Sequence, residues 1–180
     1  MLTNPIDLSK IDASQIFDHL YSIFHADFVA HRTFLASSIY IDPCSHKKDE
    51  DKELAFWHLA TRENKKKVWE NGRHHYTSIG RFLDLTRGSR LPWVKTILTQ
   101  HDHEAIKVFY HRETNKKRSL RLYLWAAEFD FVVILQQLGA SSAVLVTSFY
   151  VDNCKKRKEF EKRHYNYVNN VNNLLAERWF

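Results

Sequence analysis

The sequence predicts an α+β fold in which N-terminal helices pack on a four-stranded antiparallel β-meander, followed by a C-terminal helix. Three observations support this prediction. Apolar residues recur at three- and four-residue spacing early in the chain, which is the period of an amphipathic helix. Between residues 105 and 150 apolar and polar residues alternate, which is the period of strands. Residues 155–179 return to a helical composition whose first half is strongly basic.

The length and composition predict a single domain over residues 1–180. A chain of this size can bury an adequate core, and only 4 Gly and 3 Pro argue against long linkers. Within this domain we expect a helical N-terminal extension over 1–45, a core over 50–165 and a closing helix over 155–179.

The N-terminal segment is expected to form one helix from about Ala13 to Ala30, capped by Asp12. Its apolar residues fall on one face: Ile16, Phe17, Leu20, Ile23, Phe24 and Phe28. A short strand is expected at 38–41, before Pro43 ends it. These elements would form the first layer of the fold.

The middle of the chain contains apolar and basic stretches in close succession. Residues 53–63 change abruptly from apolar to polar. We interpret Lys65–Lys67 as the start of a basic connector. Two short helices are expected after it, at 78–85 and 92–99. Pro92 occupies a favoured first-turn position in the second of them.

Four strands are expected in the C-terminal half: Ala105–His111, Ser119–Trp125, Asp130–Leu135 and Ala143–Tyr150. The loop 113–117 is a hairpin connection between the first two. The third strand is apolar throughout, as is typical of a central strand that is buried on both faces.

Charge and hydropathy restrict the classes of partner. Lys and Arg total 27 against 21 Asp and Glu, so the net charge is +6, which permits nucleic acid, anionic lipid or an acidic protein as partner. No apolar run approaches the roughly 20 residues that cross a bilayer, and the N-terminus lacks signal-peptide features. We expect Cys44 and Cys154 to be reduced thiols. We therefore expect a cytoplasmic protein without a membrane partner.

The second predicted strand offers the first candidate site. If its leucines pack inward, the alternate side chains point away from the core: Arg121, Tyr123 and Trp125. Guanidinium groups pair with phosphates and aromatic rings stack on bases, so such a face suits a nucleic acid, and Lys107 on the preceding strand would extend it. The alternative is an ordinary solvated face that a helix partly covers.

Two further arginines stand where they could hold a phosphate. His58 and Arg62 are four residues apart, so a helical turn would align a proton-transfer group with a phosphate-binding group. The alternative is a helix-surface pair. Arg90 directly precedes a predicted helix start, where free backbone N–H groups favour anions. Here the alternative is an arginine that lies over Trp93.

Hydroxyl and basic residues follow at the end of the last predicted strand. Thr147, Ser148 and Tyr150 precede a Lys/Arg-rich tract that begins with Lys155 and Lys156. The hydroxyls could bind phosphate, or they could reflect β-propensity alone. The sequence 101–103 (His-Asp-His) has no further ligand at a metal-binding spacing, and no Gly-rich phosphate loop is present, so we predict no metal and no cofactor.

Taken in order, these segments resemble one family. They are 56–63 (FWHLATRE), 90–93 (RLPW), 104–110, 122–125 (LYLW), 130–135 (DFVVIL) and 144–151 (VLVTSFYV), followed by the basic helix. The ensemble resembles phage- and mobile-element-associated proteins of the barnase–EndoU–colicin–RelE superfamily of metal-independent ribonucleases. The likeness covers about residues 50–165. Each motif is weak by itself, and their order and spacing carry the resemblance.

The resemblance implies an endoribonuclease whose active site is the open face of the sheet. The ribose 2′-OH would attack the adjacent phosphate and leave a 2′,3′-cyclic phosphate. It assigns the chemistry to five residues: His58, Arg62, Arg90, Arg121 and Thr147. The residues assigned to nucleic-acid binding are Thr61, Trp93, Lys107, Tyr123, Trp125, Tyr150, Lys155 and Lys156.

The resemblance leaves the general acid open. Four residues could fill that role: His103, His111, Glu63 and Glu128. It also implies a toxin that an acidic antitoxin or immunity protein neutralises. Two other functions use the same basic surface, namely a non-catalytic nucleic-acid-binding module and a basic protein-interaction domain.

Overall fold

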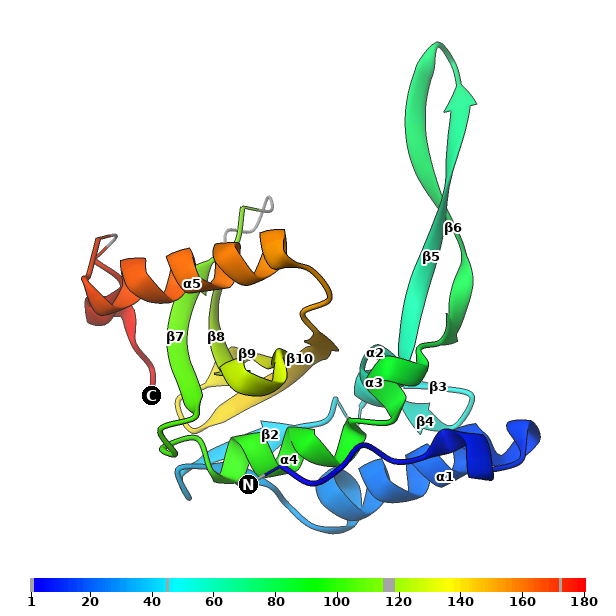
Figure 1. Cartoon of the computed structure of the whole chain (residues 1–180), viewed down its shortest axis with the longest axis horizontal. Helices are drawn as coiled ribbons and strands as arrows, with labels where there is room; N and C mark the ends of the chain where they lie inside the picture. The colour runs from blue at the N-terminus through cyan, green and yellow to red at the C-terminus, as the bar shows by residue number, and fades with distance from the viewer. Residues whose placement is uncertain (1, 45, 115–118, 172) are drawn as a thin grey trace.

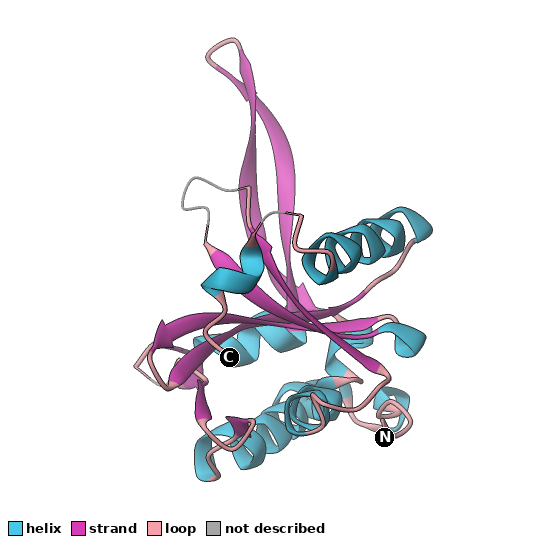
Figure 2. Cartoon of the chain, turned by 90° about the vertical axis from the view of Figure 1, so that its left-hand side faces the viewer, coloured by secondary structure: helices cyan, strands magenta, loops and turns pink. Residues whose placement is uncertain are grey.

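A curled, mixed six-stranded sheet forms the centre of the fold (Figures 1 and 2). The computed structural model describes residues 2–44, 46–114, 119–171 and 173–180. The strand order across the sheet is β1-β2-β10-β9-β8-β7. The strands are β1 (Phe34–Leu35), β2 (Ile39–Asp42), β7 (Ile106–Arg112), β8 (Leu120–Ala126), β9 (Phe131–Gly139) and β10 (Ser142–Tyr150).

The predicted antiparallel meander exists as β7–β10, but the prediction of a four-stranded antiparallel sheet is wrong. β2 pairs in parallel with β10, and β1 pairs with β2. Alternate residues Ile39 and Ile41 of β2 are buried, so this strand extends the core across the edge that β10 would otherwise expose. β2 confirms the short strand expected at 38–41, and the N-terminal extension is therefore not only helical.

The helical segment predicted over residues 13–30 is present and is subdivided. A short 3₁₀ helix (η2, Ala13–Gln15) leads into α1 (Ile16–Phe24), which continues as a π-helical segment (η3, His25–Ala30). The Asp12 carboxylate accepts a hydrogen bond from the Ser14 backbone N–H at 2.8 Å, which confirms the predicted cap. With η1 (Leu8–Lys10) and α4 (Leu91–Thr99), these helices cover one face of the sheet (Figure 2).

The helix predicted over 78–85 is wrong, because this stretch belongs to a long β-hairpin. β5 (Thr61–Glu70) and β6 (Arg73–Leu83) pair along their whole length and project from the body (Figure 1). Asn71 (φ 52°) and Gly72 (φ 74°) form the two-residue turn between them. Positive φ at both positions is the geometry of a type I′ turn, which Asn-Gly favours.

Short elements surround the base of this hairpin. β3 (Lys48–Asp49) and β4 (Lys52–Glu53) form a small ribbon ahead of α2 (Leu54–Ala60), and α3 (Leu85–Gly88) follows β6. Between β8 and β9 lies the 3₁₀ turn η4 (Ala127–Phe129).

The sheet carries a core on each face. Leu122 and Leu124 face the N-terminal helices, as the alternation predicted. Tyr123 and Trp125 point to the other face, but they are only 2% and 0% exposed because α5 (Cys154–Val168) packs over them. The expectation of an open aromatic face is therefore wrong: the stripe is apolar enough to require a cover.

The C-terminal segment departs from the single helix predicted over 155–179. α5 ends at Val168, and a 3₁₀ helix (η5, Leu174–Glu177) follows. Cys44 and Cys154 are free thiols. Across the described ranges, none of the helices combines the length and the apolar character that spanning a bilayer requires.

Candidate functional site

A basic pocket of about 410 Å³ lies between the outer sheet face and α5. Four cationic residues and two carboxylates line it: Arg87, Arg121, Lys156, Arg163, Glu113 and Glu159. The lining therefore carries an excess charge of +2, and Thr147 adds a hydroxyl from β10. We call this cavity the basic pocket.

The sheet register brings the pocket's floor together. Thr147 of β10 pairs with Ile134 of β9, which in turn pairs with Tyr123 of β8. A bulge between Leu145 and Thr147 lies beside this row. Arg121 lies two residues from Tyr123 on the same strand and so faces the same side. Strand pairing thus places Thr147 and Arg121 on one surface.

The apolar side of the pocket is closed by a single residue of α5. The ring of Phe160 contacts four aromatic side chains of the sheet at centroid distances of 5.7–6.3 Å: Phe109, Tyr123, Trp125 and Phe149. This cluster fixes α5 over one half of the sheet face. The other half, which carries the charged residues, remains accessible as the pocket.

A polar network spans the β8 side of the pocket. The Tyr123 hydroxyl donates to the Glu113 carboxylate, and Arg163 Nη1 donates to the same hydroxyl at 3.3 Å. Arg121 Nη1 lies 3.6 Å from Glu113 Oε1. Burial, and then the neighbouring Glu113, raise the pKa of Tyr123 well above its usual range. Tyr123 therefore stays protonated as a structural donor.

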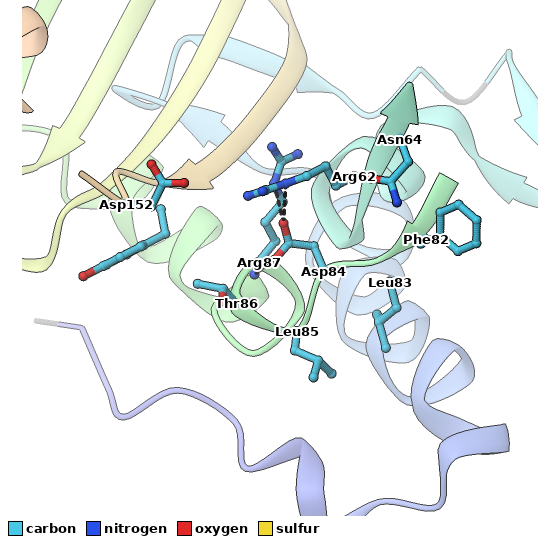
Figure 3. A pocket seen from close by; sticks show the side chains of 10 residues that line it. Arg62, Asn64, Phe82, Leu83, Asp84, Leu85, Thr86, Arg87 and Asp152 are labelled. Carbon is cyan, nitrogen blue, oxygen red and sulfur yellow. Dashed lines mark hydrogen bonds and ion pairs between the residues drawn. The ribbon is translucent and has the colours of Figure 1, made fainter. Parts of the chain in front are cut away.

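Arg87 connects the basic pocket to a second pocket of about 470 Å³ at the base of the hairpin (Figure 3). Its Nη1 donates to the backbone carbonyl oxygens of His58 and Thr61, both at 3.2 Å. Its Nε lies 3.5 Å from Asp84 Oδ2, and Arg62 Nε approaches the same oxygen at 3.0 Å. Two guanidinium groups thus share one carboxylate.

His58 lies beside this cluster as a half-buried imidazole. Burial, and then the charge of Arg81, lower its pKa below the ordinary value of 6.5. A hydrogen bond to the Val146 backbone opposes this shift, so one ring nitrogen donates to a carbonyl. The other nitrogen of a neutral ring is then an acceptor. The Thr147 hydroxyl donates to the His58 carbonyl at 3.3 Å and ties α2 to β10.

The structure brings together four of the five residues to which the sequence assigned the chemistry. His58, Arg62 and Thr147 surround Arg87, and Arg121 lies across the basic pocket. The expected alignment of His58 and Arg62 on one helical turn is wrong, because α2 ends at Ala60 and Arg62 belongs to β5.

Arg90 lies outside this group. Its Nη1 donates to the Thr86 carbonyl at 2.9 Å. Its guanidinium lies over the rings of Trp93 (5.2 Å) and Tyr150 (5.0 Å). This is the alternative considered for the sequence, an arginine that lies over Trp93, extended by a second aromatic ring.

The residues predicted to bind nucleic acid divide by exposure. Four are buried: Thr61, Trp93, Tyr123 and Trp125. Of these, Tyr123 still lines the basic pocket. Lys107 lies over the Trp125 ring at 5.2 Å. Tyr150 lines the pocket at the hairpin base, Lys156 lines the basic pocket, and Lys155 is exposed.

Of the four candidate general acids, His111 lies nearest to the basic pocket. It stands opposite Arg121 in the β7–β8 ladder, and its ring contacts Tyr123 at 6.1 Å. Burial, and then Arg163, lower its pKa. The others lie elsewhere: His103 accepts from the Ala105 N–H, Glu63 pairs with Lys65, and Glu128 is in η4.

Two arginines of the site and the β5–β6 hairpin were not predicted from the sequence. Arg87 and Arg163 carried no distinguishing motif, since each is one of several basic residues in its segment. The hairpin did have a signal, because Asn71-Gly72 between polar and β-branched residues is a strong mark of a two-residue turn. Within the described residues, no three His, Cys, Asp or Glu side chains are grouped to hold a metal ion.

Comparison of the chain with protein-family models, with curated proteins and with solved structures finds no match.

Proposed function

We propose that this protein is an endoribonuclease that cleaves RNA by transesterification of the 2′-OH, without a metal ion. One observation carries the proposal. A basic pocket on the sheet face holds Arg87, Arg121 and Thr147, and Arg87 directly contacts the backbone of His58. The ordered motifs that resemble the metal-independent ribonuclease superfamily support the same reaction.

The pocket is suited to a phosphodiester. Its lining carries an excess charge of +2, and the partners of the two excess cations, Asp84 for Arg87 and Asp152 for Lys156, lie outside the lining. Arg121 has a buried Nε–H without a hydrogen-bond acceptor among the described residues, and the buried Arg87 Nε has only its ion pair with Asp84 Oδ2 at 3.5 Å. Unsatisfied buried donors are costly, and guanidinium groups match phosphate oxygens in charge and geometry. We assign both arginines to the phosphate, where they would also stabilise the charge of a phosphorane.

His58 is assigned the role of general base. Its neutral ring accepts the proton of the 2′-OH while the 2′-oxygen bonds to phosphorus. The bond from phosphorus to the 5′-oxygen breaks, and the leaving oxygen takes a proton from water in the open pocket. The products are a 2′,3′-cyclic phosphate and a 5′-OH.

His111 is assigned to binding in this scheme. It lies on β7, three strands from Thr147, which corresponds to about 14 Å at the usual strand spacing. One phosphate cannot bridge that separation. His111 and Arg163 therefore contact the neighbouring nucleotide.

A non-catalytic RNA-binding module is the second candidate. It is favoured by the absence of histidine from the residues that line the basic pocket, as far as the structure describes them. In either case the protein would act on RNA in the cytoplasm. The basic surface would also complement an acidic antitoxin, as in a toxin–antitoxin or phage-conflict system.

Incubation with labelled RNA in excess EDTA separates the two candidates. The enzyme hypothesis predicts cleavage by the wild type and by Lys10→Ala, an exposed control on η1. It predicts loss of cleavage in His58→Ala and in Arg87→Ala. RNA binding without cleavage in the wild type would instead establish the binding module.

A further inference from the structure

The β5–β6 hairpin exposes large aromatic side chains far from the body of the protein. Trp69 is 62% exposed and Tyr76 is 68% exposed. Both lie near the tip, on a ribbon that rises away from the sheet and from α5 (Figure 1). Isolated two-stranded ribbons are marginally stable in water, and exposed aromatic surface of this kind marks an interaction site.

The register divides the tip into two unlike faces. In an antiparallel pair, directly opposed residues lie on the same face, and the faces alternate along the strand. One face, which we call the stacking face, consists of Lys65, Lys67, Trp69, His74, Tyr76 and Ser78. The opposite face consists of Lys66, Val68, Glu70, Arg73, His75 and Thr77. Aromatic rings and lysines are interleaved on the stacking face alone.

The charge of the hairpin identifies the class of partner. Its 23 positions from Thr61 to Leu83 hold six Lys or Arg and two Glu, a net +4 of the chain's +6. The two carboxylates already have partners, since Glu63 pairs with Lys65 and Glu70 with His75. Two such hairpins would repel each other, which disfavours a second copy of the chain. An anionic polymer is favoured.

The aromatic residues select among anionic polymers. A ring that stacks on a base requires the base to be free of its duplex neighbours, whereas lysines pair with any phosphate. On the stacking face Tyr76 lies opposite Lys67, Trp69 lies one pair nearer the tip and Lys65 one pair nearer the base, an arrangement that matches single-stranded nucleic acid.

The base of the hairpin adjoins the candidate site. Arg62 and Phe82 of the hairpin line the same pocket as Arg87 of α3 (Figure 3). A strand whose phosphate lies near Arg87 can therefore continue along the hairpin toward its tip. The ten residues of β5 correspond to about 33 Å of extended chain.

We propose that the β5–β6 hairpin is a second RNA-binding element, which holds a single-stranded segment that flanks the cleavage site. Bases stack on Trp69 and Tyr76, and phosphates pair with Lys65 and Lys67. The inference rests on the proposed function in taking RNA as the occupant. Its test is independent of cleavage.

Tryptophan fluorescence reports on the hairpin directly. Trp69 is the one of the five tryptophans whose side chain is largely exposed. Titration with a single-stranded homopolymer RNA should quench the emission of the wild type. Trp69→Phe should lose the quenching and keep most of the affinity, because phenylalanine still stacks. The double variant Trp69→Ala, Tyr76→Ala should bind about tenfold or more weakly.

Matched variants on the two faces provide the control. Lys65→Ala with Lys67→Ala removes two cations from the stacking face, and Lys66→Ala with Arg73→Ala removes two from the opposite face. The proposal predicts the larger loss of affinity for the first pair. Equal losses would mean that only net charge matters, and would overturn the stacking geometry. Unquenched Trp69 at RNA saturation would overturn the proposal.

Two further outcomes separate this inference from the enzyme hypothesis. If no RNA is cleaved but quenching and its dependence on Trp69 persist, the enzyme hypothesis fails and the hairpin inference stands. If a dinucleotide is cleaved and the alanine double variant cleaves long single-stranded RNA as well as the wild type does, the hairpin inference fails. A wild type that self-associates and does not bind RNA would also overturn it.

Discussion

Arg87 Nη1 lies 3.2 Å from the backbone carbonyl oxygen of His58, so α3 is tied directly to α2. The same nitrogen reaches the Thr61 carbonyl, and the Thr147 hydroxyl approaches the His58 carbonyl from β10. The backbone that carries the imidazole is therefore held from two sides. The arginine that holds it also lines the basic pocket, so in the proposed mechanism both phosphate binding and proton transfer would depend on Arg87.

Arg87→Lys should separate charge from geometry at this position. A lysine keeps the positive charge but lacks the planar fork that reaches two carbonyls and Asp84. We expect the free energy of unfolding to fall by about 1–3 kcal/mol and cleavage to fall by more than tenfold. Urea denaturation and kcat/KM measure the two effects. If Arg87→Lys cleaved RNA at the wild-type rate, the assignment of Arg87 to phosphate binding would be wrong.

The pH dependence of kcat/KM should show that the neutral form of His58 is the active one. Burial and Arg81 lower the pKa of this imidazole below 6.5, so its base form predominates at neutral pH. We expect the rate to be constant there and to fall as pH drops through the lowered pKa of His58. A rate that rises as the pH falls below 6.5 would show that protonated His58 is the active form.

Folding stability should also fall on the acid side. Burial lowers the pKa values of His111 and His164 as well, so below pH 6.5 the unfolded chain binds more protons than the native protein. The stabilisation by neutral histidine is complete above pH 6.5 and is lost as pH falls. His111→Gln with His164→Gln should weaken this dependence in urea titrations between about pH 8 and about pH 5. An unchanged pH dependence would contradict the assignment.

Two substitutions on one strand should affect stability very unequally. Trp125 is fully buried under α5, so Trp125→Ala should lower the free energy of unfolding by about 3–5 kcal/mol. Arg121→Ala, with Gln136→Ala beside it as control, should cost about 1 kcal/mol or less and still impair RNA cleavage. Parallel thermal melts and cleavage assays test this. Severe unfolding by Arg121→Ala would make it a structural residue.

The sequence predicted the meander well because its alternation is a local signal. Leu122 and Leu124 face one core and Tyr123 faces the other, as a period of two requires. A helix that partly covers this face was the alternative left open, but no local signal identified α5 as that helix. α5 is strongly polar and contributes one buried residue, Phe160, whose partners lie on other strands.

The remaining misses have two different causes. The β2–β10 pairing joins residues about a hundred positions apart, and no local pattern reports such a contact. The β5–β6 hairpin is a local structure, but three consecutive lysines at Lys65–Lys67 conceal its alternation, because both of its faces are solvated. The dipeptide Asn71-Gly72 was the local feature that indicated the two-residue turn of this hairpin. β5 begins at Thr61, so Arg62 lies on a strand while His58 lies on α2. Their four-residue spacing therefore did not align them on one helical turn.

End-group analysis of the RNA products tests the central claim most directly. An RNA with one cleavable position is incubated with the protein in excess EDTA, beside a matched RNA whose ribose at that position is 2′-deoxy. Transesterification predicts a 2′,3′-cyclic phosphate and a 5′-OH from the first RNA, and no cleavage of the second at that position. Products with a 5′-phosphate, or equal cleavage of both RNAs, would contradict the account.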